Sequence, residues 1–223
     1  MVAFFVLIIF LSVLAIDMVV LHMRGKYHPA FEPSYNLRDK LIFDKSNFII
    51  PSELFFSKGH TWLRKNDDGI FDIGIDSFGA VVLGTMPILM CADEGIRIKR
   101  GEILLEAGKG DAKIRFLSPV SGIIKAVNNN LIGNKIPDAY ATWRIKLIPE
   151  DFAENGKMFL SGSRASAWMK KEFGKLKEFI DNRSPLIESA GVTMYDGGTV
   201  SDDAVSSLVI NYTNEFEIKF LSL

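Results

Sequence analysis

Residues 103–127 read ILLEAGKGDAKIRFLSPVSGIIKAV, and this stretch decides the fold class. It consists of three short apolar runs separated by two turns, the first rich in glycine and the second built around Pro119. Short strands bounded by Gly, Pro, Asn and Asp are typical of β-sandwiches and small barrels. The stretch therefore predicts a β-hairpin whose tip, residues 108–111, protrudes from a β domain.

Further short apolar segments lie on both sides of this hairpin, at spacings of about ten residues. They include residues 61–64, 69–75 and 143–147. Only residues 76–83 have a helical pattern, with Asp76 as a good N-cap and apolar residues at helical spacing. We therefore expect a mainly β domain with helical additions over residues 53–150.

Six short motifs in this part of the chain resemble, in the same order, those of the glycine cleavage system H protein family. The motifs are His60-Thr61-Trp62, Asp72-Ile73-Gly74-Ile75-Asp76-Ser77-Phe78, Leu83-Gly84-Thr85-Met86, Gly95-Ile96-Arg97-Ile98-Lys99-Arg100-Gly101-Glu102, Ser118-Pro119-Val120-Ser121-Gly122, and Tyr140 with Trp143 and Lys146. The resemblance implies a biotinyl/lipoyl-like β-sandwich, the single hybrid motif. It also implies a carrier or adaptor protein rather than a catalyst.

In the family, a lysine at the tip of this hairpin carries lipoate within a Glu-Ser-x-Lys-Ala pattern. Counting forward from Glu106 by the family's spacing places Lys109 at the lipoyl position. Counting back from Pro119 places Asp111 there instead. The resemblance therefore implies a hairpin tip that is two residues longer than in the family. The glycines on both sides of Lys109 predict a more flexible tip as well.

Two interpretations of Lys109 follow. It is either the attachment site of a lipoyl arm, or an unmodified turn lysine in a domain that has kept the fold and lost the cofactor. We favour the second interpretation, in which the protein carries no cofactor; Lys113 is a weaker candidate for modification. His60 and Trp62 are expected to pack at the start of a strand. Cys91 lies in an apolar run and is expected to be a small buried residue.

Residues 1–23 read MVAFFVLIIFLSVLAIDMVVLHM, with Asp17 as the one charged side chain at pH 7. A helix of this length spans the hydrocarbon core of a bilayer, which predicts one transmembrane anchor followed by a juxtamembrane linker over residues 24–52. A cleaved signal peptide is the alternative, but no basic residue precedes the run. Basic residues follow it, from Arg24 to Lys45, so the globular part is expected in the cytoplasm. Asp17 either lies neutral near the helix end or contacts a partner subunit.

Residues 151–223 are expected to form a C-terminal extension with one amphipathic helix. Its apolar positions follow three/four spacing, with Ser163 as the expected N-cap and an end at Asn182. The helix is expected to pack on the sandwich; docking to a partner or to a membrane surface is the alternative. Residues 216–221 alternate apolar and charged side chains, which predicts an edge strand or an amphipathic tail.

The composition excludes several classes of function. The 26 Lys and Arg against 27 Asp and Glu give a formal net charge of −1, which excludes a nucleic-acid binder that depends on bulk positive charge. A single cysteine forms no intrachain disulfide and no cysteine-rich zinc site. With three histidines in the chain, a histidine-rich metal site is not expected either.

The sequence thus predicts a single-pass membrane protein with a non-catalytic H-protein-like domain on the cytoplasmic side. Its expected role is an interaction or assembly module with protein partners, for example beside a membrane redox complex. The alternative is a lipoylated carrier that moves an aminomethyl or related group between glycine-cleavage-type enzymes through Lys109. A third interpretation is a domain that only stabilises a larger complex.

Overall fold

The computed structural model describes residues 45–136, 138–150, 152, 156–183 and 204–223. The predicted transmembrane anchor at residues 1–23 and residues 24–44 of the predicted linker lie outside the described residues. Within them, no helix combines the length and the apolar character needed to cross a membrane.

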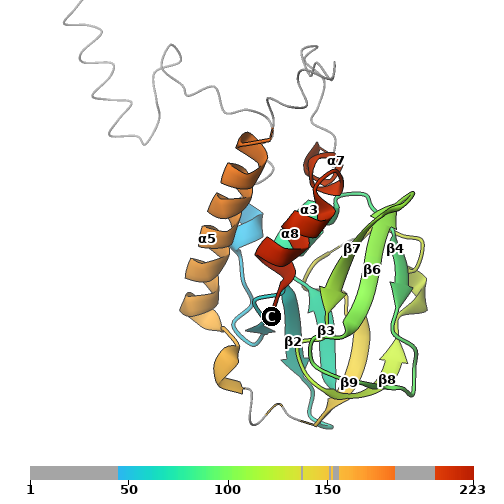
Figure 1. Cartoon of the computed structure of the whole chain (residues 1–223). Helices are drawn as coiled ribbons and strands as arrows, with labels where there is room; N and C mark the ends of the chain where they lie inside the picture. Colours follow the sequence, from blue (N-terminus) through green and yellow to red (C-terminus); the bar gives the residue numbers. More distant parts are fainter. Residues whose placement is uncertain (1–44, 137, 151, 153–155, 184–203) are drawn as a thin grey trace, which may run out of the picture. The chain divides into compact units, whose positions relative to one another are not determined.

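Two antiparallel sheets form the body of the domain (Figure 1). The larger sheet has the strand order β1 (Phe55–Phe56), β2 (Thr61–Lys65), β3 (Phe71–Ile75), β9 (Ile145–Pro149), β8 (Gly122–Val127) and β5 (Arg97–Ile98). The smaller sheet has the order β4 (Ile88–Cys91), β6 (Ile103–Lys109) and β7 (Ala112–Leu117). The predicted class, mainly β with helical additions, is confirmed for the described residues.

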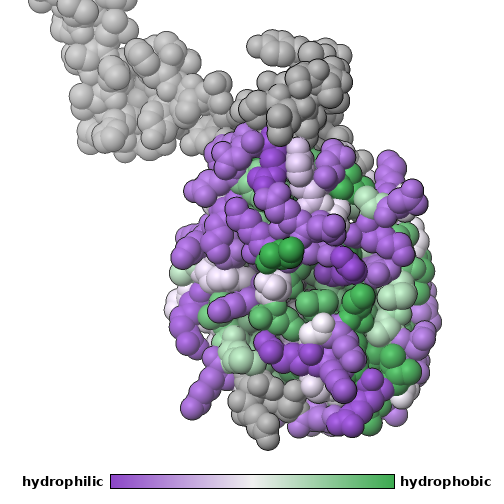
Figure 2. All heavy atoms as spheres, viewed as in Figure 1, coloured by the Kyte–Doolittle hydropathy of each residue, from purple (hydrophilic) through white to green (hydrophobic). Residues whose placement is uncertain are grey.

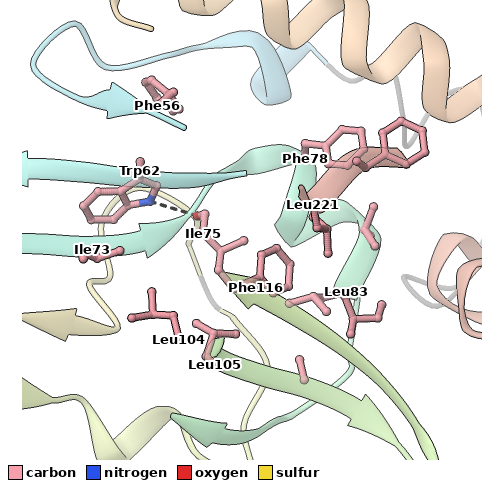
Figure 3. Packing of buried hydrophobic residues seen from close by; sticks show 14 of the residues in the cluster. Phe56, Trp62, Ile73, Ile75, Phe78, Leu83, Leu104, Leu105, Phe116 and Leu221 are labelled. Carbon is pink, nitrogen blue, oxygen red and sulfur yellow. Dashed lines mark hydrogen bonds between the residues drawn. The ribbon is translucent and has the colours of Figure 1, made fainter. Parts of the chain in front are cut away.

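Apolar side chains from the strands fill the space between the two sheets. Ile73 and Ile75 of β3 lie close to Leu104, Leu105 and Phe116 of the smaller sheet (Figure 3), and all five are fully buried. Burial of such side chains is the main driving force of folding. The packed interior fixes the register of β6 and β7, and thereby the position of the hairpin between them.

The one helix predicted inside the β domain is confirmed as α3 (Ser77–Leu83). Asp76 is its N-cap, and the carboxylate accepts a hydrogen bond of 2.9 Å from the backbone N–H of Gly79. This bond satisfies one of the amide groups that a helix leaves free at its start.

The predicted amphipathic helix is α5 (Gly162–Asp181), and Asn182 ends it as expected. Its N-cap is Ser161 rather than Ser163, because the extended backbone reaches only as far as Ser161. Its apolar face packs on α3 and on the 3-10 helix η2 (Lys45–Phe48), with the rings of Phe48 and Phe173 5.2 Å apart.

The edge strand or tail predicted for residues 216–221 is wrong. The chain end forms the helices α7 (Ala204–Ile210) and α8 (Thr213–Phe216) and the π-helix η5 (Glu217–Leu221). In a strand, Ile218 would share a face with Phe216 and Phe220, whereas it is 77% exposed and both phenylalanines are buried. Contacts with α5 and β7 therefore override the alternating pattern.

Two further 3-10 helices, η3 (Asn129–Leu131) and η4 (Gly156–Met158), lie in connecting segments. The helical segments after residue 155 share one hydrophobic cluster with the two sheets. The predicted domain limits, 53–150 and 151–223, stay predictions.

Candidate functional site

The hairpin between β6 and β7 ends in a two-residue turn. Lys109 pairs with Ala112 across the ladder, so Gly110 and Asp111 are the central residues. Gly110 has a φ of 63°, and a positive φ at the first central residue is the requirement of a type II′ turn. The predicted hairpin is confirmed, and two residues, Gly110 and Asp111, form its turn, within the expected tip of residues 108–111.

Gly108, the first glycine of the hairpin tip, lies in a close contact between backbone segments. A Cβ atom at this position would lie 2.2 Å from the carbonyl oxygen of Ala112. The N–H of Gly108 donates to the carbonyl oxygen of Pro87 at 3.1 Å, which ties β6 to the start of β4. Gly108 is therefore required by the close approach of two backbone segments, and it is held on both sides.

The two lysines of the hairpin have different surroundings. Lys109 is exposed at the last position of β6, and no described residue forms an ion pair with its amine. Lys113 lies on β7, and its amine is 3.2 Å from the carboxylate of Glu106. Asp111 lies at the second central position of the turn. The family spacing counted back from Pro119 thus leads to Asp111, which lies in the turn. The spacing counted forward from Glu106 leads to Lys109, which lies at the end of the strand before the turn.

The outer face of the hairpin is joined to the chain end by one carboxylate. Glu217 of η5 accepts hydrogen bonds from the backbone N–H of Arg115 at 2.7 Å and from its guanidinium at 2.6 and 3.0 Å. These hydrogen bonds, together with the charge of Glu217, raise the pKa of Arg115. Sequence reasoning missed this contact, because it joins residues 102 positions apart.

An open groove of about 680 Å³ runs beside this contact. One wall is the hairpin, which contributes Glu106, Arg115 and residues 111–113. The other wall is residues 210–215, from the end of α7 to the start of α8. The lining mixes carboxylates, cations and amides. The lining also includes the apolar side chains of Ala112 and Ile210, so the groove is mixed in character, and it opens next to the tip of the hairpin.

His60 and Trp62 pack at the start of β2, as predicted. The fully buried ring of His60 stacks on Phe78 and Trp168, with centroid distances of 3.8 and 4.8 Å. Its Nδ1 lies 2.9 Å from the carboxylate of Asp76, the residue that caps α3. The indole N–H of Trp62 donates to two backbone carbonyl oxygens, at 2.7 and 3.0 Å. Both residues therefore connect β2 to its neighbours.

Cys91 is buried, as expected, and burial raises the pKa of its thiol to about 11. Arg144, which sequence reasoning missed, is fully buried between the sheets, and two of its guanidinium nitrogens have no hydrogen-bond partner among the described residues. Burial lowers its pKa to about 10.

Within the described ranges, no group of three His, Cys, Asp or Glu side chains is placed to hold a metal ion.

Comparison with known proteins gives one consistent family. The family model described as "Glycine cleavage H-protein" matches residues 54–172. The "Glycine cleavage system H protein" of Nitrosospira multiformis is 33% identical over 114 residues, which cover 49% of this chain and 87% of that protein. A "Probable glycine cleavage system H protein" of Pyrococcus abyssi is 26% identical over 132 residues, 58% of this chain and 98% of that protein.

Among solved structures, a glycine cleavage system H protein from Mycobacterium marinum matches with 22% identity and a TM-score of 0.44. The match covers 55% of this chain and 99% of the other.

Proposed function

Because this chain belongs to the glycine cleavage H-protein family, we propose that it is a non-catalytic member that is anchored in a membrane and carries no lipoate. Its role is that of an interaction or assembly module for protein partners at the cytoplasmic face. The proposal has two parts, the state of the hairpin lysine and the anchor, and each has its own support and its own test.

The pairing of Lys109 with Ala112 is the observation that carries the first part. It leaves Gly110 and Asp111 as the only residues between the strands, and neither has an amine that could form the amide bond to lipoate. Lys109 projects from a strand end instead of from the turn. A ligase that recognises a lysine within a tight turn would find an aspartate at that place.

The groove beside the hairpin supports an adaptor role further. Its far wall, residues 210–215, is linked to β7 through Glu217 and Arg115. The hairpin flank and the chain end thus form one surface of mixed polar and apolar character next to an exposed lysine, Lys109. Mixed, partly charged surfaces of this kind suit transient contacts with other proteins.

The second part rests on the sequence. The apolar run of residues 1–23 is long enough to cross a bilayer, and the basic residues that follow it favour retention of the domain in the cytoplasm. A reporter protein fused after Leu223 is expected to be active in the cytoplasm. Reporter activity on the opposite side would overturn the orientation.

Intact-mass measurement of the chain purified from its own host tests the first part. We expect the mass of the unmodified chain and no signal in an anti-lipoate blot, while an ordinary H protein in the same extract gives a signal. A lipoyl mass increment that disappears in a Lys109→Arg variant and persists in a Lys113→Arg variant would contradict the proposal.

The alternative function is a lipoylated carrier that serves glycine-cleavage-type enzymes. Two observations favour it: the spacing from Glu106 to Lys109 matches the family pattern, and Lys109 is exposed. The mass measurement decides between the two functions, because only the carrier needs the modified lysine.

A further inference from the structure

The two halves of α5 differ in charge. Residues 156–171 contain four basic residues and no acidic residue. Three of the four lie on α5 and form no ion pair with any described residue: Arg164, Lys170 and Lys171. The second half, residues 172–181, contains three acidic and two basic residues, and both lysines form ion pairs, Lys175–Glu172 and Lys177–Asp181.

The three unpaired cations occupy one exposed face of the helix, which we call the basic face of α5. Arg164 and Lys171 are seven positions apart and thus lie two turns apart on the same side, with Lys170 beside Lys171. The opposite side carries Met169 and Phe173, both fully buried. In Figure 2, hydrophilic side chains project along the edge of the domain that α5 forms in Figure 1.

Helix stability does not explain these charges. The N-terminal end of a helix has a partial positive charge, so acidic side chains are favourable there and basic ones are unfavourable. The first turn of α5 contains no acidic residue, and it contains Arg164. Arg164 lies at the unfavourable end of the helix, Lys170 and Lys171 lie near its middle, and none of the three has a counter-charge among the described residues. Such a face points to a negatively charged partner outside the chain.

The position where the chain enters the domain indicates which partner this is. The 3-10 helix η2 packs on α5 through Phe48 and Phe173. The apolar run of residues 1–23 is joined to η2 by residues 24–44, which span roughly 70 Å at full extension and less as a coil. A membrane anchor at residues 1–23 would therefore keep α5 within reach of the bilayer surface.

We propose that the basic face of α5 binds the anionic phospholipid headgroups of the membrane that holds the anchor. The proposal rests on the membrane anchoring proposed above, because the tether supplies the high local concentration of lipid that a weak contact needs. Each Lys or Arg near an anionic leaflet strengthens binding by about fivefold. Three such residues give roughly a hundredfold preference for the docked position over zwitterionic lipid.

A fluorescence experiment on the full chain tests this contact. The chain carries Ala167→Cys, on the basic face of α5, labelled with a fluorophore; Cys91 is buried, and the unsubstituted chain gives its background labelling. The labelled chain is reconstituted in phosphatidylcholine vesicles with or without phosphatidylglycerol, both doped with a headgroup-linked quencher. Glu94→Cys, on the exposed loop before β5, is the control label position.

We expect strong quenching at position 167 in anionic vesicles, little in zwitterionic vesicles, and little at position 94 in either. Raising the salt from about 0.1 M to about 1 M shortens the screening length from about 10 Å to about 3 Å and should remove the quenching. Charge reversal of the basic face should lower the docking constant at least tenfold. The variant is R164E/K170E/K171E, and its matched control, with the same change in charge on exposed residues elsewhere, is K99E/R100E/K125E.

The proposal would be overturned if position 167 were quenched equally in both kinds of vesicle. It would also be overturned if both charge-reversed variants lost the same amount of quenching. An acidic protein partner in place of lipid would leave position 167 unquenched in pure vesicles, which also overturns it. Alkaline carbonate extraction of the same vesicles tests the anchor separately. If the chain stays in the membrane pellet but position 167 is not quenched, the anchor is supported and the docking proposal is contradicted.

Discussion

Residues 113–117 of β7 and residues 217–221 of η5 have nearly the same sequence and fold differently. The first read KIRFL and the second EIKFL: a charge, Ile, a charge, Phe and Leu in both. In β7 the isoleucine, Ile114, is fully buried, whereas the corresponding Ile218 of η5 is 77% exposed. The phenylalanine is buried in both segments.

The difference lies in the partners that each segment finds. A two-residue turn brings β7 back onto β6, so its backbone pairs in a ladder and its side chains alternate between two faces. The segment η5 continues α8, and Phe216 and Phe220 lie on one helical face, against Phe78 and Phe179. An alternating pattern is therefore compatible with both a strand and a helix, and the contacts with neighbouring elements decide which of the two forms.

The isoleucine pair gives the largest expected difference. Ile114→Ala removes a fully buried side chain from between the sheets and should lower the free energy of unfolding by about 2–5 kcal/mol. Ile218→Ala changes an exposed side chain and should stay within about 0.5 kcal/mol of the parent chain. Urea denaturation of both variants measures the difference. Similar losses in the two variants would mean that residues 217–221 bury Ile218, as a strand would.

A glycine pair tests whether the short turn depends on close backbone contact. Gly108→Ala places a Cβ against the carbonyl oxygen of Ala112 and should cost about 1–3 kcal/mol. Gly174→Ala on α5 meets nothing within 4 Å and should stabilise the chain by up to about 1 kcal/mol. Thermal unfolding distinguishes the two directions. A neutral Gly108→Ala variant would show that the hairpin tip is looser than its register indicates.

The contact between the two segments themselves should have a smaller effect. A double-mutant cycle with Arg115→Gln and Glu217→Gln should give a coupling free energy of about 1 kcal/mol, because the pair is charged and bidentate but partly exposed. Urea denaturation of the four chains provides the measurement. A coupling indistinguishable from zero would mean that η5 is held on β7 by its phenylalanines alone.

The fold of the β domain could be predicted because its signals are local. The Gly-rich turn, the Pro-Val-Ser-Gly turn and the Asp76 cap each act within a few residues, and short motifs in a fixed order identified the family. The chain end could not be predicted in the same way. Its helical state depends on contacts with α3 and α5, which no pattern within residues 204–223 encodes.

The candidate site was predicted only in part, for a similar reason. Two spacings within the hairpin pointed to different residues, Lys109 and Asp111, and only the ladder register decides which of them lies in the turn. Glu217 and Arg144 were missed because their surroundings come from distant segments. A single acidic residue in an alternating run, or a basic residue between Trp and Ile, has no local feature that predicts such contacts.

The smallest changes in the free energy of unfolding should come from substitution of Lys113 in β7 and Lys219 in η5. The dependence of these changes on salt concentration should differ between the two lysines. Lys113 lies 3.2 Å from Glu106 in an exposed ion pair, so Lys113→Gln should cost about 0.5 kcal/mol at low salt and nothing measurable near 1 M salt. The amine of Lys219 lies 5.5 and 5.6 Å from the ring centres of Phe179 and Phe220. Lys219→Gln should therefore cost about 0.5–1 kcal/mol, and part of the loss should remain at high salt, because the side-chain stem also packs on the rings. Urea denaturation at two salt concentrations measures both effects. The same loss and the same salt dependence for both lysines would indicate that η5, like β7, presents its cation to an acidic partner and not to aromatic rings.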